Sequence, residues 1–188
     1  MDATAKPGDA IVVDGLSKRY GAVLAVDNIG FRVRQGSFTA LLGGNGAGKT
    51  TTIAMLLGLV QPSAGRIEIL GQDFARHRKS LLARMNFQSP YADLPRRLTV
   101  RQNLTIYARL YGVRDVAARI AQLAKDLDLV SLLDRPLGEL SAGQRTRAGL
   151  AKAFINRPAI VLLDEPTASL DPDTADWVRG FLEAYARE

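Results

Sequence analysis

Residues 38–58 read FTALLGGNGAGKTTTIAMLLG, and this stretch decides the fold. The short apolar run Phe38–Leu42 predicts a strand that ends at glycine. Residues 43–50 fit the pattern G-x-x-x-x-G-K-[ST]. Lys49–Leu57 predicts a helix with Gly58 near its C-cap. A strand, a glycine-rich loop and a helix in this order are typical of a phosphate-binding loop.

Each residue type in this loop has a physical role. Glycines let the backbone curl, so that successive N–H groups point at phosphate oxygens, and the helix start adds its positive dipole end. Lys49 is expected to reach the β- and γ-phosphates, and the Thr50 hydroxyl to ligate Mg²⁺. Thr51 is either a further phosphate contact or an ordinary helix residue. The predicted ATP-binding loop residues are therefore Gly43, Gly44, Asn45, Gly46, Ala47, Gly48, Lys49, Thr50 and Thr51. The alternative is a glycine-rich turn without a ligand.

Two acids follow a second decisive stretch. Ala159–Leu163 is a continuous apolar run, as expected for a buried parallel strand, and Asp164 and Glu165 come directly after it. The carboxyl end of such a strand is where α/β folds bind ligands. We expect Asp164 to hold Mg²⁺ and Glu165 to act as general base toward a water molecule. Alone, the pair could be two solvated loop acids, but the phosphate-binding loop upstream favours the catalytic interpretation.

Strand and helix patterns alternate at both ends of the chain. Ala10–Val13, Ile29–Val33 and Arg66–Leu70 predict further strands, and Thr174–Ala186 predicts a final amphipathic helix. Between Arg76 and about Leu150, apolar residues recur at helical spacing. We therefore predict an α/β core that carries a helical insertion.

Composition limits the remaining possibilities. The 188 residues suit one domain, and the 47% apolar and 23% charged shares are ordinary for a globular protein. Apolar runs fall far short of the ~20 residues of a membrane-spanning helix, and the first residues predict no signal peptide. The absence of cysteine excludes disulfides, thiolate zinc sites and a cysteine nucleophile. The net charge of +6 fits a mildly basic surface, an anionic membrane face or nucleic acid, and decides nothing alone.

A third motif, Leu140-Ser141-Ala142-Gly143-Gln144, precedes a helical stretch in which Ser141 is a good N-cap. With this motif the chain, from about Ile11 to Glu188, resembles the ATP-binding cassette (ABC) ATPases, specifically the nucleotide-binding domain of an ABC transporter. The motifs also arrive in the family's order, which adds Tyr20 before the loop, Gln88 after it, and Ser169-Leu170-Asp171 after the acid pair.

This resemblance implies an α/β fold of the P-loop NTPase class: an ABC-type core sheet with N-terminal antiparallel β strands and a helical subdomain. The domain would span residues 10–188, with the helical subdomain inserted at about 89–155, and would be incomplete at its C-terminus. The family has a switch histidine beyond the last helix, and the chain ends before it. His77, in the polar stretch Arg76–Lys79, is expected to be a surface residue instead.

The resemblance also implies residue roles. Tyr20 would stack on adenine, although it could be an ordinary surface tyrosine. Gln88, Thr50 and Asp164 would bind Mg²⁺. Gln88 would also act in catalysis together with Lys49 and Glu165. The alternative is that Gln88 is an ordinary loop glutamine. In a head-to-tail homodimer, the signature residues of one cassette would contact the ATP that is bound to the other cassette. Asp171 would lie at the seam, the interface between the two cassettes. The residues reaching the opposite ATP would be Ser141, Ala142, Gly143 and Gln144.

Two substitutions depart from the family pattern: Gly44 stands where proline is common, and Ala142 where the first signature glycine is usual. Neither is expected to inactivate the protein. The 188-residue chain alone is expected to bind Mg-ATP yet turn it over poorly.

The interval between Lys49 and Ser141 holds no coiled coil, unlike DNA-repair cassettes, and translation-factor cassettes come in pairs. A transporter is therefore favoured. The sequence resembles that of exporters whose membrane subunit is a separate chain, in the segments Gln88–Pro95 and Arg97–Leu104. Pro90–Pro95 would either bind that membrane subunit, the permease, or form a solvated loop. The protein would lie peripherally on the cytoplasmic face of the cell membrane, without direct nucleic-acid contact. The alternatives are a non-catalytic ATP-binding fragment and a non-transport ABC protein of the translation or DNA-repair type.

Overall fold

The computed structural model describes residues 8–89, 94–164, 166–167 and 170–187. These residues divide into two compact units. The first unit comprises the chain up to Leu82 together with the residues from Leu182 onward, and the second comprises Ala83–Phe181. The phosphate-binding loop belongs to the first unit, and Gln88, Asp164 and the signature belong to the second.

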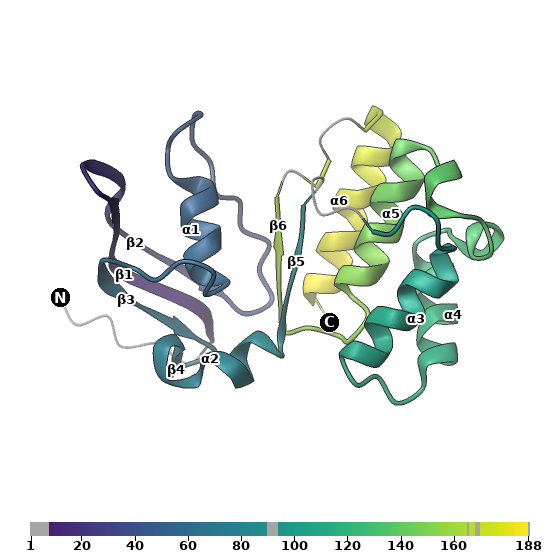
Figure 1. Cartoon of the computed structure of the whole chain (residues 1–188), viewed down its shortest axis with the longest axis horizontal. Helices are drawn as coiled ribbons and strands as arrows, with labels where there is room; N and C mark the ends of the chain where they lie inside the picture. The colour runs from purple at the N-terminus through teal and green to yellow at the C-terminus, as the bar shows by residue number, and fades with distance from the viewer. Residues whose placement is uncertain (1–7, 90–93, 165, 168–169, 188) are drawn as a thin grey trace. The chain divides into compact units, whose positions relative to one another are not determined.

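The first unit contains a four-stranded antiparallel sheet in the order β2-β1-β3-β4 (Figure 1). Its core side is formed by apolar side chains of the central strands, such as Ile11, Leu16 and Ile69, which are almost completely buried. Two helices, α1 and α2, accompany the sheet. The bounds are β1 Asp9–Tyr20, β2 Val23–Arg34, α1 Lys49–Leu56, β3 Ala64–Ile69, β4 Gln72–Asp73 and α2 Phe74–Leu82.

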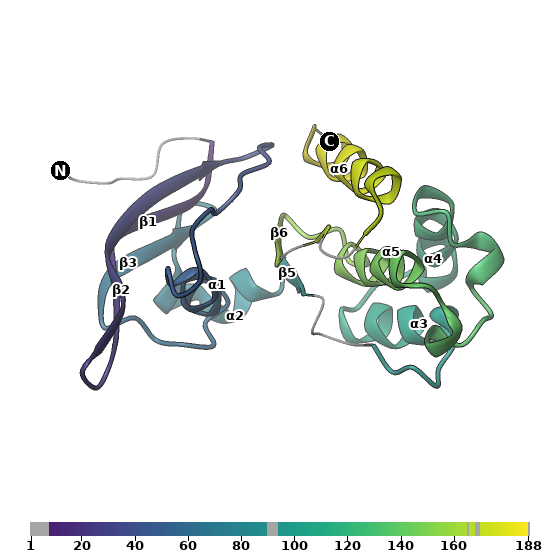
Figure 2. The same ribbon diagram turned by 90° about the horizontal axis from the view of Figure 1, so that it is seen from above.

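The second unit combines a short parallel sheet with a group of helices. Strands β5 and β6 pair in parallel, with Met85 opposite Ile160 and Gln88 opposite Leu163. Helices α3, α4 and α5 pack against one another, as both views show (Figures 1 and 2). The bounds are β5 Met85–Gln88, α3 Val100–Leu110, α4 Val116–Asp126, 3₁₀ turns η1 Val130–Leu132 and η2 Leu137–Glu139, α5 Ala142–Ala153, β6 Ile160–Leu163 and α6 Pro172–Arg187.

Aromatic side chains join α6 to the rest of the second unit. The Phe154 ring, almost fully buried after α5, meets the Phe181 ring edge-on at 5.2 Å between centroids. Phe181 in turn stacks on Trp177 at 6.1 Å. Edge-to-face and offset-stacked pairs are the favoured aromatic geometries. These contacts fix α6 beside α5, the helix that carries the signature.

The parallel strand at Ile160–Leu163 and the helical middle of the chain are confirmed. The N-terminal strands are longer than predicted, because the ladder continues past polar residues through register shifts near Gly15 (φ 59°). Such bulges are not visible in an apolar pattern.

The predicted strand at Phe38–Leu42 is wrong: no residue of this stretch pairs with any described strand. Its side chains are exposed, Leu42 by 87%. An apolar run becomes a strand only where a neighbouring strand accepts its backbone hydrogen bonds, and no described strand pairs with this stretch.

Candidate functional site

The phosphate-binding loop ends at a helix that no side chain caps. Gly48 is the N-cap of α1 in a left-handed conformation (φ 81°), without a side-chain hydrogen bond to the first turn. A Cβ at Gly48 would lie 2.5 Å from the Ala25 carbonyl oxygen, so only glycine fits there. The first N–H groups of α1 are therefore open to an anion, and the helix dipole favours one.

Lys49 folds back over this loop. Its Nζ donates to the carbonyl oxygens of Gly43 at 2.5 Å and Gly44 at 2.9 Å. The residues around it, from Gly43 to Ala47, are exposed. An ammonium group held next to uncapped backbone N–H groups is suited to bind phosphate oxygens. Thr50 is exposed and Thr51 is half-buried at the start of α1.

Tyr20 lies at the end of β1 in the same unit. Its side chain is 48% exposed, and the Lys18 ammonium lies 4.9 Å from the ring centroid. The Lys18 ammonium thus positions one face of the Tyr20 ring, while much of the ring is exposed to solvent. His77 lies on α2, exposed, with Nδ1 3.2 Å from the Asp73 carbonyl oxygen, as expected for a surface histidine.

Gln88 and Asp164 meet at the carboxyl ends of β5 and β6. The Asp164 N–H donates to the Gln88 carbonyl oxygen at 2.9 Å, and the buried Ser89 hydroxyl donates to Asp164 Oδ2 at 3.2 Å. Gln88 Nε2 donates to the Ser89 carbonyl oxygen, whereas its buried Oε1 has no hydrogen-bond partner among the described residues. A carboxylate and an unpaired amide oxygen at one sheet edge are ligands that Mg²⁺ accepts.

Helix α5 packs directly on this sheet edge. Lys152 Nζ donates to the Phe87 carbonyl oxygen at 3.0 Å and lies 5.4 Å from the Tyr107 ring centroid. Burial lowers the pKa of Lys152. A Cβ at Gly149 would lie 2.6 Å from Gln88 Nε2, so this glycine leaves room for the glutamine. No sequence pattern points to Ser89, Gly149 or Lys152, because the contacts of these residues join distant segments.

The signature begins α5 with a capping box. Ser141 Oγ accepts the Gln144 N–H at 3.2 Å, and the Ser141 N–H donates to Gln144 Oε1 at 3.0 Å. The prediction that Ser141 is an N-cap is confirmed. A Cβ at Gly143 would lie 3.3 Å from Thr174 Cγ2, so Gly143 allows α6 to approach closely.

Asp171 caps the start of α6 beside the signature. Its Oδ1 accepts the Thr174 N–H at 3.0 Å, and its Oδ2 accepts the Thr174 hydroxyl at 2.7 Å. These hydrogen bonds, the backbone one first, lower the pKa of Asp171. Thr174 thus links Asp171 to Gly143, and the second unit brings the two predicted dimer-contact segments together.

This geometry makes a pH-dependent prediction for Asp171→Asn. A carboxylate whose pKa falls on folding stabilises the protein above its unfolded pKa, and the contribution is lost as the pH falls through the lowered folded pKa. Asp171→Asn is therefore expected to lower the melting temperature at pH 7, with the difference shrinking below about pH 3.9. Thermal denaturation followed by circular dichroism from pH 7 to pH 3 checks this, with the exposed Asp126→Asn as control. A difference that persists unchanged at pH 3 would contradict it.

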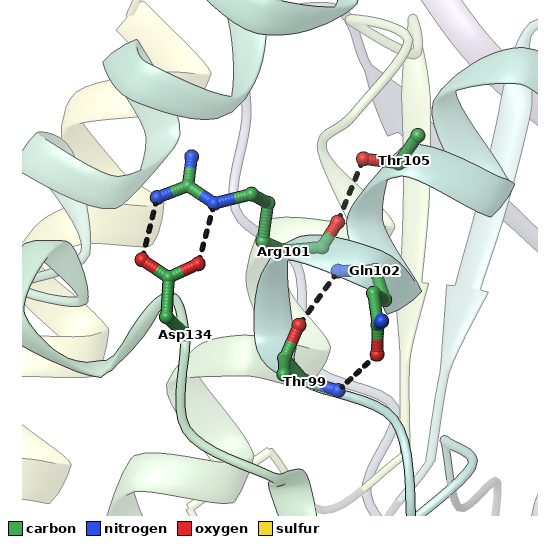
Figure 3. A network of polar contacts seen from close by, with 5 residues as sticks. All are labelled: Thr99, Arg101, Gln102, Thr105 and Asp134. Carbon is green, nitrogen blue, oxygen red and sulfur yellow. Dashed lines mark hydrogen bonds and ion pairs between the residues drawn. The ribbon is translucent and has the colours of Figure 1, made fainter.

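A polar network joins the segment after Gln88 to the segment before the signature (Figure 3). Arg101 donates to both carboxylate oxygens of Asp134, at 2.7 and 2.9 Å, which lowers the pKa of Asp134. Thr99 caps α3 through a capping box with Gln102. The Arg101 N–H also donates to the Leu133 carbonyl oxygen at 2.8 Å. The two segments therefore form one connected structure within the second unit.

Several predicted residues lie outside the described part of the chain. Glu165 and Ser169 are among them, as are residues 90–93 of the predicted permease-contacting segment Pro90–Pro95. Within the described residues, no three His, Cys, Asp or Glu side chains gather as a metal site. The same residues contain no helix of the length and apolarity that crossing a membrane requires.

Comparison with known proteins shows which family this chain is similar to. A family model described as ABC transporter matches residues 26–168. The chain is 38% identical over 173 residues to the bacitracin transport ATP-binding protein BcrA of Bacillus licheniformis, covering 92% of this chain and 56% of that protein. It is 41% identical over 165 residues to the daunorubicin resistance ATP-binding protein DrrA3 of Streptomyces coeruleorubidus, covering 87% and 52%. The chain thus spans about half the length of these relatives.

A solved structure of an ABC transporter component has a similar fold. The chain superposes on cbiO1 from Clostridium perfringens, part of the ABC transporter complex cbiONQ, with a TM-score of 0.85 and 26% identity, covering 96% of this chain and 74% of that one. The predicted P-loop NTPase fold class is thereby confirmed.

Proposed function

The chain belongs to the ABC transporter family, and on that premise we propose that it binds and hydrolyses Mg-ATP to drive transport by a separate membrane subunit. One observation carries the proposal: an exposed loop places the Lys49 ammonium beside the uncapped N-terminus of α1. This arrangement offers backbone donors, a dipole and a point charge to a chain of phosphates.

Different residues of this chain would bind ATP and act in its hydrolysis. Tyr20 would stack on adenine, residues 43–48 would surround the phosphates with backbone N–H groups, and Lys49 would leave the Gly43 and Gly44 carbonyl oxygens for the β- and γ-phosphates. Glu165 would take a proton from the attacking water. Gln88 would help to orient that water from the end of β5.

Mg²⁺ is the cofactor proposed for this site. Asp164 and Gln88 Oε1 would hold it together with the Thr50 hydroxyl, and the unpaired, buried state of Gln88 Oε1 supports this ligand set. When bound, the metal ion would supply positive charge that neutralises the phosphate oxygens. The Ser89 hydroxyl orients the Asp164 carboxylate.

A second cassette would complete the site. Residues 141–144 begin α5, and their backbone N–H groups would approach the γ-phosphate held by the opposite subunit of a head-to-tail homodimer. Asp171 would lie at the seam between the two subunits, because Thr174 joins it to Gly143. Bound ATP would then join the two cassettes, and hydrolysis would release them.

The transport partner is proposed from the relatives. Their names state bacitracin transport and daunorubicin resistance, which favours export by a separate permease. The chain would then lie peripherally on the cytoplasmic face of the cell membrane, without direct nucleic-acid contact. Its domain would comprise residues 10–188, with a helical subdomain at about 89–155.

Metal removal tests the hydrolytic function. The full protein with its membrane partner is expected to release phosphate from ATP in the presence of Mg²⁺, and to lose at least about 100-fold in rate with excess EDTA, because the phosphate charges are no longer neutralised. Phosphate release and binding of a fluorescent ATP analogue are measured in parallel. Binding without hydrolysis in Mg²⁺ would contradict the ATPase proposal and favour a non-catalytic ATP-binding protein.

A further inference from the structure

A hollow in the second unit lies apart from every residue assigned above. It has a volume of about 430 Å³. Its walls come from the connection between α3 and α4, the first turns of α4 and the turn between α5 and β6. The side chains that matter are Tyr111, Arg114, Arg119, Gln122, Ile155 and Arg157.

The lining is strongly cationic. The lining contains three arginines, Arg114, Arg119 and Arg157, and one carboxylate, that of Asp115. The Asp115 carboxylate is occupied as the N-cap of α4, accepting the Ala118 N–H at 3.0 Å. Among the described residues, neither Arg114 nor Arg157 has a carboxylate within ion-pair distance. By formal charge, the three arginines of the lining outnumber its single carboxylate.

Two of these guanidinium groups are held in place. Arg119, which is 91% buried (9% exposed), donates from Nε to the Ile155 carbonyl oxygen at 3.0 Å and from one Nη to Gln122 Oε1 at 3.0 Å. Arg157 donates to the same Gln122 oxygen at 3.2 Å. The shared acceptor keeps the two positive groups side by side, although like charges repel. Arg157 also has a left-handed backbone (φ 52°), which non-glycine residues rarely adopt.

We propose that this hollow binds a phosphate monoester. Such a group carries about −1.5 to −2 charges at neutral pH, which matches the positive charges of Arg114 and Arg157. Guanidinium groups match phosphate oxygens with paired N–H donors. The Tyr111 ring and Ile155 supply apolar surface for the carbon part of the ligand, and the volume lies in the usual range for small-molecule pockets, about 300–1,000 Å³. A soluble phosphate ester and a phosphorylated lipid headgroup share this chemistry.

Binding here would add a link to the hydrogen bonds that Arg119 and Gln122 of α4 already make with Ile155 and Arg157. The anion would hold the α3–α4 connection to the turn between α5 and β6, the strand that ends at Asp164. The site shares no residue with the nucleotide loop, so it does not depend on the proposed ATPase activity.

Calorimetric titration with glycerol 3-phosphate tests the proposal. The full protein carrying Lys49→Ala is used, so that phosphate binding at the nucleotide loop is weakened. Arg114→Gln and Arg157→Gln are each expected to weaken glycerol 3-phosphate binding by about tenfold or more, because each removes a charge-assisted hydrogen bond. The matched control, Arg109→Gln, removes an exposed arginine of α3 outside the hollow and is expected to change nothing. Melting temperatures verify that every variant is folded.

A second arm separates the two sources of phosphate. Co-sedimentation is measured with phosphatidylcholine vesicles with and without phosphatidic acid. Arginine-dependent binding of glycerol 3-phosphate in solution supports a soluble ligand, and arginine-dependent binding to the phosphatidic acid vesicles alone supports a lipid headgroup. The proposal is overturned if neither probe binds, or if Arg109→Gln weakens binding as much as Arg114→Gln does.

Discussion

Replacing Glu165 by glutamine in the full protein is expected to lower ATP turnover by about 100-fold or more while ATP binding persists. The change keeps the size of the side chain and removes the group proposed to accept a proton from water, and general-base catalysis contributes roughly 10²–10⁴-fold. Because bound ATP is then not consumed, the head-to-tail dimer is expected to accumulate.

Phosphate release and ATP-dependent dimerisation by size-exclusion chromatography measure this result. Asp126→Asn, a comparable change at an exposed position on α4, serves as the control and is expected to leave both unchanged. A Glu165→Gln protein that stays monomeric at saturating ATP would remove the basis for a shared site between two cassettes.

The second large effect is expected for Lys49→Met. Lys49 is the only cation among residues 43–51, and its Nζ lies at the loop carbonyl oxygens of Gly43 and Gly44. Methionine has a similar length and no charge, so the variant tests the ammonium group and not the packing. Loss of one such phosphate contact typically costs about 10²–10³ in rate, and ATP affinity is expected to fall as well.

Binding of a fluorescent ATP analogue and phosphate release are measured for Lys49→Met beside Lys79→Met, an exposed lysine of α2. The melting temperature without nucleotide is expected to stay within a few degrees, because Gly46 and Gly48, not Lys49, set the course of the loop. Unchanged ATP affinity in Lys49→Met would exclude this loop as the nucleotide site.

Local features were predictable because their causes lie within a few residues. The start of α1 follows from the left-handed Gly48, and the start of α5 follows from a serine that caps its own helix three residues on. The strand before Asp164 followed from an apolar run too short for a helix. In each case the residues that determine the structure are neighbours in the chain.

Phe38–Leu42 has the composition of a buried strand, yet its side chains are exposed and no described strand pairs with it. A strand depends on hydrogen bonds from another segment, and the apolar pattern does not name that segment. The domain boundaries and the catalytic roles therefore stay predictions.

By itself, the sequence determined the class of chemistry: a phosphate-binding loop, an acid pair after a strand and a signature before a helix, in the order of one family. Only the tertiary structure decided that Ser89 holds Asp164, that Lys152 and Gly149 place the signature helix against Gln88, and that three arginines line one hollow. The physical reason is distance along the chain. Backbone conformation and capping depend on adjacent residues, whereas these contacts join segments that are brought together only by folding.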